Sequence, residues 1–166
     1  LIPGKNTVKR FLITFFLVGL LTTSCKPTQL GTKANPITIY FTPSVETKVI
    51  EKNSRTFIKY LEKHTDLAFK AHIPSDYYTV IEALGSKRAD ISIMNSFGYL
   101  LANKKFGAKA KLKVIRRGKD YYRGQIIAHV DSKINTIKDI EGKRFAFTNP
   151  TSTSGFLFPL KILVDN

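Results

Sequence analysis

Apolar positions in the first two thirds of the chain follow two different periods. Short β-rich runs with a period near two lie at 37–41, 67–73 and 90–94. Apolar residues that return every three or four positions, the spacing of one helix face, lie across 45–64, 77–84 and 97–107. Strands separated by helices of this length favour βαβ units and a mainly parallel sheet.

The pattern changes near Tyr121–Gly124, where a second set of elements begins. Further strands are predicted at 112–115, 123–130 and 144–148. A short helix is predicted at 136–141, and a helical stripe begins at Phe156. We therefore expect two α/β lobes, the first at 37–122 and the second at 123–166, with the second lobe incomplete.

The first 24 residues have the pattern of an export signal rather than of a folded element. Three basic residues, Lys5, Lys9 and Arg10, precede an uncharged apolar run at 11–21. This run is shorter than the ~20 residues that a membrane-spanning helix needs. It fits the apolar centre of a secretory signal, so we expect residues 1–24 to be a signal peptide.

A single cysteine, Cys25, follows three small residues at 22–24. This arrangement resembles the lipobox of bacterial lipoproteins, although Thr22 stands where a leucine is usual. The resemblance implies that Cys25 is acylated and attaches the protein to a membrane. Cleavage elsewhere, or a short membrane anchor with Cys25 buried, are the alternatives. The polar segment 25–36, which contains proline and glycine, is expected to be a tether.

Composition and charge exclude several classes of chemistry. The chain has 166 residues, 43% of them hydrophobic, which is enough for a core. One cysteine and three histidines argue against a disulfide framework and against a metal site. The formal charge of +15 suggests nucleic-acid binding, but an exported protein does not meet nucleic acid. The basic stretch 104–119 is better explained as a solvated face that also attracts anionic lipid.

The segment 148–155, Thr-Asn-Pro-Thr-Ser-Thr-Ser-Gly, carries the strongest candidate chemistry. It joins a predicted strand to a helical pattern, which is where open α/β sheets bind ligands. Hydroxyl groups and free backbone N–H groups at a helix start suit an oxyanion, and Gly155 allows close approach. The alternative is a capping turn, because Ser and Thr favour such positions. Pro159 predicts that the regular helix restarts there.

This segment, continued to Pro159, resembles the Asp-Pro-x-Ser-Thr-Ser-Gly-Tyr-Leu-x-Pro motif of periplasmic phosphonate/phosphite/phosphate-binding proteins of ABC importers. Residues 137–147, 75–84 and 88–91 resemble other stretches of the same family, in the same order along the chain. Asn149 stands where the family has aspartate. The resemblance implies an α/β fold like that of type II periplasmic binding proteins, with two lobes that close on ligand.

The resemblance also implies ligand contacts at named positions. Ser152, Thr153 and Ser154 would hold the phosphonate oxygens, and Tyr77 would contact ligand from the first lobe. A further aromatic contact of the family falls near 94–97, where Asn95 or Ser96 could substitute, and we expect Ser96. From the residues alone, Tyr77 could instead pack in the core, and Ser96 could cap a helix.

We therefore expect an exported, lipid-anchored receptor that binds phosphonate, phosphite or phosphate and delivers it to an ABC permease. The alternative is a ligand-sensing input domain of a signalling protein with the same fold. No Ser-His-Asp grouping and no Gly-Lys-Ser/Thr phosphate loop is readable, so an enzyme is not expected. No cofactor, metal or nucleic-acid partner is expected either.

Overall fold

The computed structural model describes residues 28–166, so the predicted signal peptide and Cys25 lie outside the described residues. Strand β1 (Ile37–Phe41) lies at the centre of a three-stranded parallel sheet, between β2 (Phe69–His72) and β3 (Ile91–Ile93). The strand order β2-β1-β3 follows from helical crossovers between parallel neighbours. The predicted α/β class with a parallel sheet is confirmed.

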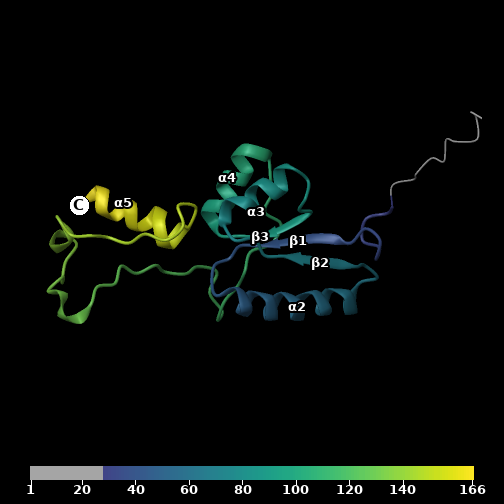
Figure 1. Ribbon diagram of the computed structural model, residues 1–166, viewed down its shortest axis with the longest axis horizontal. Coiled ribbons are helices and arrows are strands. Elements are labelled where there is room, and N and C mark those ends of the chain that lie inside the picture. Colours follow the sequence, from purple (N-terminus) through teal and green to yellow (C-terminus); the bar gives the residue numbers. More distant parts are fainter. Residues whose placement is uncertain (1–27) are drawn as a thin grey trace, which may run out of the picture.

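Three helices cover the two faces of this sheet. Helix α2 (Thr47–His64) joins β1 to β2, α3 (Tyr77–Gly85) joins β2 to β3, and α4 (Ser96–Phe106) follows β3. Figure 1 shows α2 on one side of the sheet and α3 with α4 on the other. All three helices agree with the periodicity within two residues. In the described part of the chain, no helix combines the length and the apolar character that crossing a membrane requires.

The core of the lobe is built around the central strand. Ile39 and Phe41 are two residues apart on β1, so they face the same side of the sheet, where they pack with Ile50 of α2. On α3, Val80 and Ile81 have exposed fractions of 0% and 1%. The apolar alternation of β1 and the apolar stripe of α3 therefore both enter the core, as their periods predict.

Helix α3 begins at a side-chain cap. The carboxylate of Asp76 accepts hydrogen bonds from the hydroxyl of Thr79 at 2.6 Å and from the backbone N–H of Thr79 at 3.0 Å. These two bonds lower the pKa of Asp76 below its ordinary value, because both favour the ionised form. This cap fixes the point at which the chain turns into α3, one residue before Tyr77.

Replacing Asp76 by Ala is expected to lower the free energy of unfolding by about 1 kcal/mol, because the N–H of Thr79 loses its acceptor. Since the pKa of Asp76 is lower in the folded than in the unfolded chain, this stabilisation is present above the unfolded pKa. It is lost as the pH falls through the folded pKa. Urea denaturation at neutral and acidic pH measures both effects. Asp76→Asn keeps an acceptor without the charge, so it should retain the cap and lose the pH dependence.

Part of the predicted tether is folded onto the lobe. The carbonyl of Gly31 accepts a hydrogen bond from the N–H of Ala68 at 2.7 Å, and the N–H of Gly31 donates to the carbonyl of Asn35 at 2.8 Å. Gly31 has φ +88°, and a Cβ there would lie 2.6 Å from Leu67, so glycine is needed at this close approach. The N-terminal segment therefore joins the lobe just after the end of α2.

The strands predicted at 112–115, 123–130 and 144–148 are wrong, because none of them forms in the structure. A strand requires a neighbour that exchanges N–H···O=C bonds with it, and residues 28–166 offer these segments no such ladder. Leu112 and Ile127 accordingly remain 95% and 87% exposed. The helix predicted at 136–141 is reduced to one 3₁₀ turn, Lys138–Ile140. A second 3₁₀ turn, Val130–Ser132, follows the extended segment.

The C-terminal helical stripe forms in two parts. A wide π turn, η3 (Thr153–Leu157), leads directly into α5 (Phe158–Asp165). Pro159 lies in the first turn of α5, where the missing N–H of proline costs no helical hydrogen bond. The predicted restart of the helix at Pro159 is therefore confirmed.

Candidate ligand-binding cleft

A cavity of about 760 Å³ lies between the carboxyl end of the sheet and the segment 148–155. The residues that line it are Phe41, Thr42, Pro43, Ser44, Ile50, Ser75, Tyr77, Ile93, Met94, Asn95, Arg116, Tyr122, Thr148, Asn149, Ser152, Ser154 and Gly155. The carboxyl edge of a parallel sheet is where open α/β folds bind ligands. The cavity therefore occupies the position that the strand-to-helix motif predicts.

A set of local hydrogen bonds shapes the segment 148–155. The side chain of Asn149 accepts from the N–H and the hydroxyl of Thr151, at 2.9 and 2.7 Å. The hydroxyl oxygen of Ser152 accepts from the N–H of Gly155 at 3.2 Å and caps η3. A Cβ at Gly155 would lie 2.8 Å from the Cγ2 atom of Thr148, so this position has no room for a side chain. The loop is thus held in one conformation by its own residues.

Thr153 attaches this loop to the first lobe. Its hydroxyl donates to Oδ1 of Asn95 at 2.9 Å and accepts from the N–H of Phe97 at 2.9 Å. Thr153 is only 4% exposed and is not part of the cavity lining. Its hydroxyl is therefore already engaged within the protein and fixes the position of η3 against the start of α4.

The two serines on either side of Thr153 both line the cavity and keep donor capacity. Among residues 28–166, the hydroxyl of Ser154 has no hydrogen-bond partner, and Ser152 uses only its oxygen, so its proton is free. The N–H groups of Thr153 and Ser154 open the π turn, and the described residues provide no acceptor for either. Two hydroxyls and the backbone N–H of Ser154 are therefore available at this end of the cleft.

Tyr77 approaches the same cavity from the start of α3. Burial raises the pKa of the Tyr77 hydroxyl, and the nearby Tyr122 raises it further. The phenol therefore stays protonated at neutral pH and can act as a hydrogen-bond donor. Tyr77 is half-buried and lines the cavity, so it serves both as packing and as part of the candidate site.

Ser96 is not brought into the cavity. It is the exposed first residue of α4, whereas Asn95 lines the cavity and caps the helix by accepting the N–H of Gly98 at 2.8 Å. The buried Nδ2 group of Asn95 has no hydrogen-bond partner among the described residues. The structure therefore favours Asn95 over Ser96 at this position of the cleft wall.

Arg116 is a cavity residue that the sequence did not single out. Arg116 and Lys119 exchange backbone hydrogen bonds of 2.8 and 3.0 Å across a tight turn whose central residues, Arg117 and Gly118, both have positive φ. Of the described residues that line the cavity, Arg116 alone carries a charge. The glycine inside this basic run was the sequence signal for the turn, but only the fold shows where the turn points.

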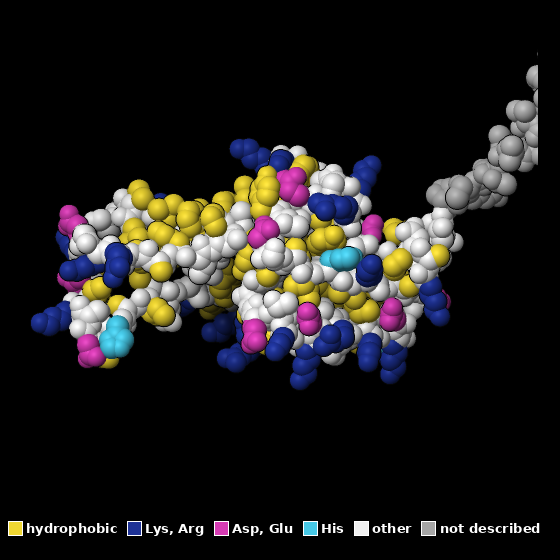
Figure 2. Space-filling model, in the orientation of Figure 1, with side chains coloured by type: hydrophobic (Ala, Val, Ile, Leu, Met, Phe, Trp, Pro, Cys, Tyr) yellow, Lys and Arg dark blue, Asp and Glu magenta, His cyan; other side chains and the backbone are white. Residues whose placement is uncertain are grey.

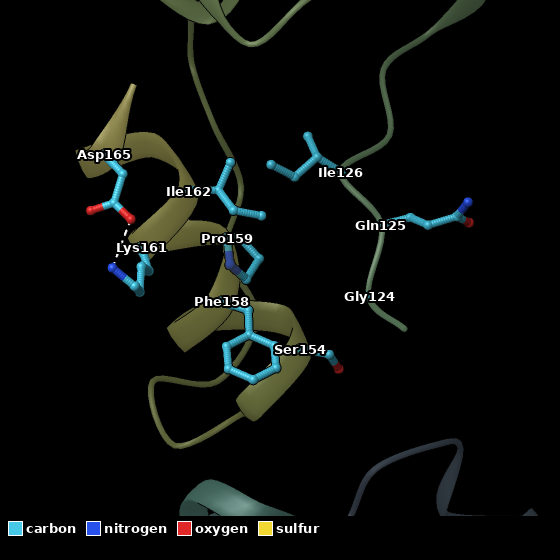
Figure 3. A pocket seen from close by; sticks show the side chains of 9 residues that line it. All are labelled: Gly124, Gln125, Ile126, Ser154, Phe158, Pro159, Lys161, Ile162 and Asp165. Atoms are coloured by element: carbon cyan, nitrogen blue, oxygen red, sulfur yellow. Dashed lines mark hydrogen bonds and ion pairs between the residues drawn. The ribbon is translucent and has the colours of Figure 1, made fainter. Parts of the chain in front are cut away.

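A second cavity, of about 380 Å³, lies between the extended residues 124–126 and α5 (Figure 3). Ile126 and Ile162 face each other across it. Its charged residues, Lys161 and Asp165, pair with each other at 2.7 Å, which leaves no free charge for a ligand. The larger cavity therefore remains the candidate binding site.

Comparison with known proteins shows the family to which the chain is similar. The model of a family described as the periplasmic substrate-binding protein of phosphonate ABC transporters matches residues 39–166. The chain is 29% identical over 158 residues to a phosphate-import protein, PhnD, of Mycolicibacterium smegmatis, with 89% of this chain and 49% of that protein covered. This chain thus spans about half the length of that relative.

The fold also resembles that of a solved structure. The binding-protein component of an ABC phosphonate transporter from Pseudomonas aeruginosa matches with a TM-score of 0.64 and 23% identity. The match covers 75% of this chain and 43% of that one. At this level of identity the likeness bears on the fold alone.

Proposed function

Because the chain belongs to the family of periplasmic substrate-binding proteins of phosphonate ABC transporters, we propose that its cleft binds a phosphonate, phosphite or phosphate oxyanion. The observation that carries this proposal is the set of free donors on one cavity. Ser152, Ser154, Tyr77 and Arg116 all line it, and its described wall contains no carboxylate. Charged oxyanions pair best with such donors, because charge-assisted hydrogen bonds are the strong ones. The family is one of binding proteins, so no catalytic step is assigned.

The residues of the proposed cradle have different roles in binding. Ser152 and Ser154 donate hydroxyl protons to the oxyanion, and the N–H of Ser154 at the start of η3 adds a further donor. The hydroxyl of Thr153 keeps the loop against Asn95. Tyr77 donates from the opposite wall, and Arg116 supplies a positive charge. A site made of donors rejects ligands that would leave those donors unpaired.

The larger assembly is proposed from the family. Residues 37–122 form the first lobe, and residues 123–166 begin a second lobe that closes over the ligand before the protein docks on an ABC permease. Support comes from the family match, which extends to residue 166, and from the relative of twice the length. A signalling input domain with the same fold would bind ligand in the same way but would not require a permease.

Export and anchoring are proposed from the N-terminal sequence. Residues 1–24 would be removed as a signal peptide, and acylation of Cys25 would hold the protein at the outer face of the membrane. The description of the family as periplasmic supports the export step. The segment 25–36 then connects the anchor to the lobe, with its last residues folded against Ala68.

Isothermal titration calorimetry of the full chain with methylphosphonate, phosphite, phosphate and sulfate tests the proposed function. We expect saturable heat with at least one of the three phosphorus oxyanions and weaker binding of sulfate. The absence of binding to all three would refute the assignment. The positive control is the same titration of the full-length phosphate-import protein of Mycolicibacterium smegmatis, to which this chain is similar. Closure of a complete second lobe on the ligand strengthens binding.

A further inference from the structure

Five basic residues form a continuous ridge along α2. Lys48, Lys52, Arg55, Lys59 and Lys63 follow one another at intervals of four, three, four and four residues. At about 100° per residue they fall within an arc of roughly 80° on the helix surface. Figure 2 shows Lys and Arg side chains projecting along the edge of the molecule where Figure 1 places α2. All five residues of this basic ridge are exposed.

The basic ridge lies opposite the face of α2 that packs on the sheet. Ile50 and Ser54, the two buried residues of the helix, are 8% and 3% exposed and mark the inner face. By the same helical geometry, the mean direction of the ridge is nearly opposite to theirs. The ridge therefore points straight away from the lobe, and it leaves the cleft, which Ile50 helps to line, uncovered.

The stability of α2 does not explain the ridge. Like charges three or four residues apart destabilise a helix, and the ridge contains four such successive pairs. Two glutamates of the helix, Glu51 and Glu62, flank it on one side, yet among the described residues no ridge cation forms an ion pair. The arrangement thus costs stability and leaves the cations available to an external partner.

The N-terminal segment leaves the lobe beside the end of this helix. Gly31 is hydrogen-bonded to Ala68, four residues after α2 ends at His64. Five residues, 26–30, lie between Cys25 and Gly31, and the six steps from one to the other span at most about 20 Å. A membrane that holds Cys25 therefore lies within this distance of Gly31, on the side of the lobe where α2 ends.

We propose that the basic ridge of α2 lies on the anionic lipid headgroups of the membrane to which the protein is anchored. This inference rests on the proposed acylation of Cys25. A polybasic surface adds to the attachment that a lipid anchor gives, because each cation near an anionic leaflet contributes to the attraction. With α2, about 27 Å long, flat on the surface, the carboxyl edge of the sheet and its cleft face sideways and stay open to solute.

Partition of the full chain, carrying Cys25→Ser to prevent acylation, between buffer and lipid vesicles tests the proposal. Two kinds of vesicle are compared: phosphatidylcholine with about 30% phosphatidylglycerol, and pure phosphatidylcholine. The readout is the partition coefficient onto the anionic vesicles divided by that onto the neutral ones. The N-terminal segment, which carries Lys5, Lys9 and Arg10, is the same in every variant, so its contribution cancels when the ratios of the variants are compared. The ridge variant is Lys52→Gln/Arg55→Gln/Lys59→Gln, since glutamine is a good helix former. The control variant is Lys87→Gln/Lys138→Gln/Lys143→Gln, which removes equal charge from exposed positions outside α2 and outside the basic stretch 104–119.

We expect the ratio to be well above one, to fall on the order of 100-fold in the ridge variant, at roughly fivefold per cation, and to stay near the parental value in the control. High salt should abolish the preference. Equal partition onto both vesicles, or equal losses in both variants, overturns the proposal. Binding to soluble polyglutamate that is tighter than binding to the anionic vesicles also overturns it, because the partner of the ridge would then be an acidic protein. The phosphonate affinity of the ridge variant should equal that of the parent. A failure of the proposed ligand binding and a failure of the proposed lipid contact can therefore be distinguished.

Discussion

Arg116→Gln is expected to weaken phosphonate binding about tenfold. A hydrogen bond to a charged partner contributes about 1.5–3 kcal/mol, and the lower end applies because Arg116 is exposed in this structure. The dissociation constant from isothermal titration calorimetry measures the change. The loss should shrink as salt is raised, since salt screens an exposed charge.

Arg117→Gln is the matched control for this prediction. Arg117 lies in the same turn and carries the same charge, but it does not line the cavity. Its replacement should change affinity only through long-range attraction, which salt removes. If both variants lose affinity equally, the charge of the turn acts at a distance and Arg116 is not a ligand contact. Arg116→Lys should recover part of the affinity, because lysine keeps the charge but not the planar set of donors.

Much of the first lobe could be predicted from the sequence because its elements have regular apolar periods and local helix caps. The pattern at 37–41 predicted β1 to the residue, and the helices were predicted within two residues at each end. In these segments the apolar period, the caps and the order of elements all favour one arrangement. Asp76 is an example, since its side chain caps α3 through Thr79, only three residues away.

The segments between residues 108 and 148 could not be predicted in the same way. The run 123–130 is long and apolar at its centre, but a strand also needs a partner, and apolar content does not state whether one is present. Among the described residues 123–130 finds none and stays extended without a ladder. The prediction at 144–148 was wrong for the same reason. Hydrophobicity predicts where a segment would be buried, not which strand would lie beside it.

The candidate site was also predicted only in part, and the part that was missed depends on contacts between residues far apart in the sequence. The motif at 148–155 and Tyr77 were identified from the sequence, and both lie at one cavity. Arg116 was not identified, and Ser96 was preferred to Asn95, because the place of these residues depends on how a remote turn and a helix cap approach the motif. The hydroxyl of Thr153 is a further case, since its partner Asn95 is 58 residues away. Spacing along the chain cannot distinguish a free hydroxyl from one that is already bonded.

Thr153 and Ser154 are therefore expected to respond differently to the loss of their hydroxyls. Thr153→Val keeps the shape of the side chain but leaves the part-buried N–H of Phe97 without its acceptor at 2.9 Å. An unsatisfied buried group costs about 1–3 kcal/mol, and the lower end applies to a part-buried one, so the free energy of unfolding without ligand should fall by about 1 kcal/mol. Ser154→Ala removes a hydroxyl that has no partner among residues 28–166, so stability should be unchanged while affinity falls about tenfold or less.

Urea denaturation without ligand and calorimetric titration with methylphosphonate separate the two roles. Thr153→Ser is the control for the first, because it retains the hydroxyl that joins Asn95 to Phe97. Thr153→Val should also weaken binding, since η3 loses its attachment to α4 and the donors of the loop are no longer held in place. Equal stability of Thr153→Val and Thr153→Ser would contradict the positioning role. A loss of stability in Ser154→Ala as large as that in Thr153→Val would place both hydroxyls in the fold rather than in the cleft.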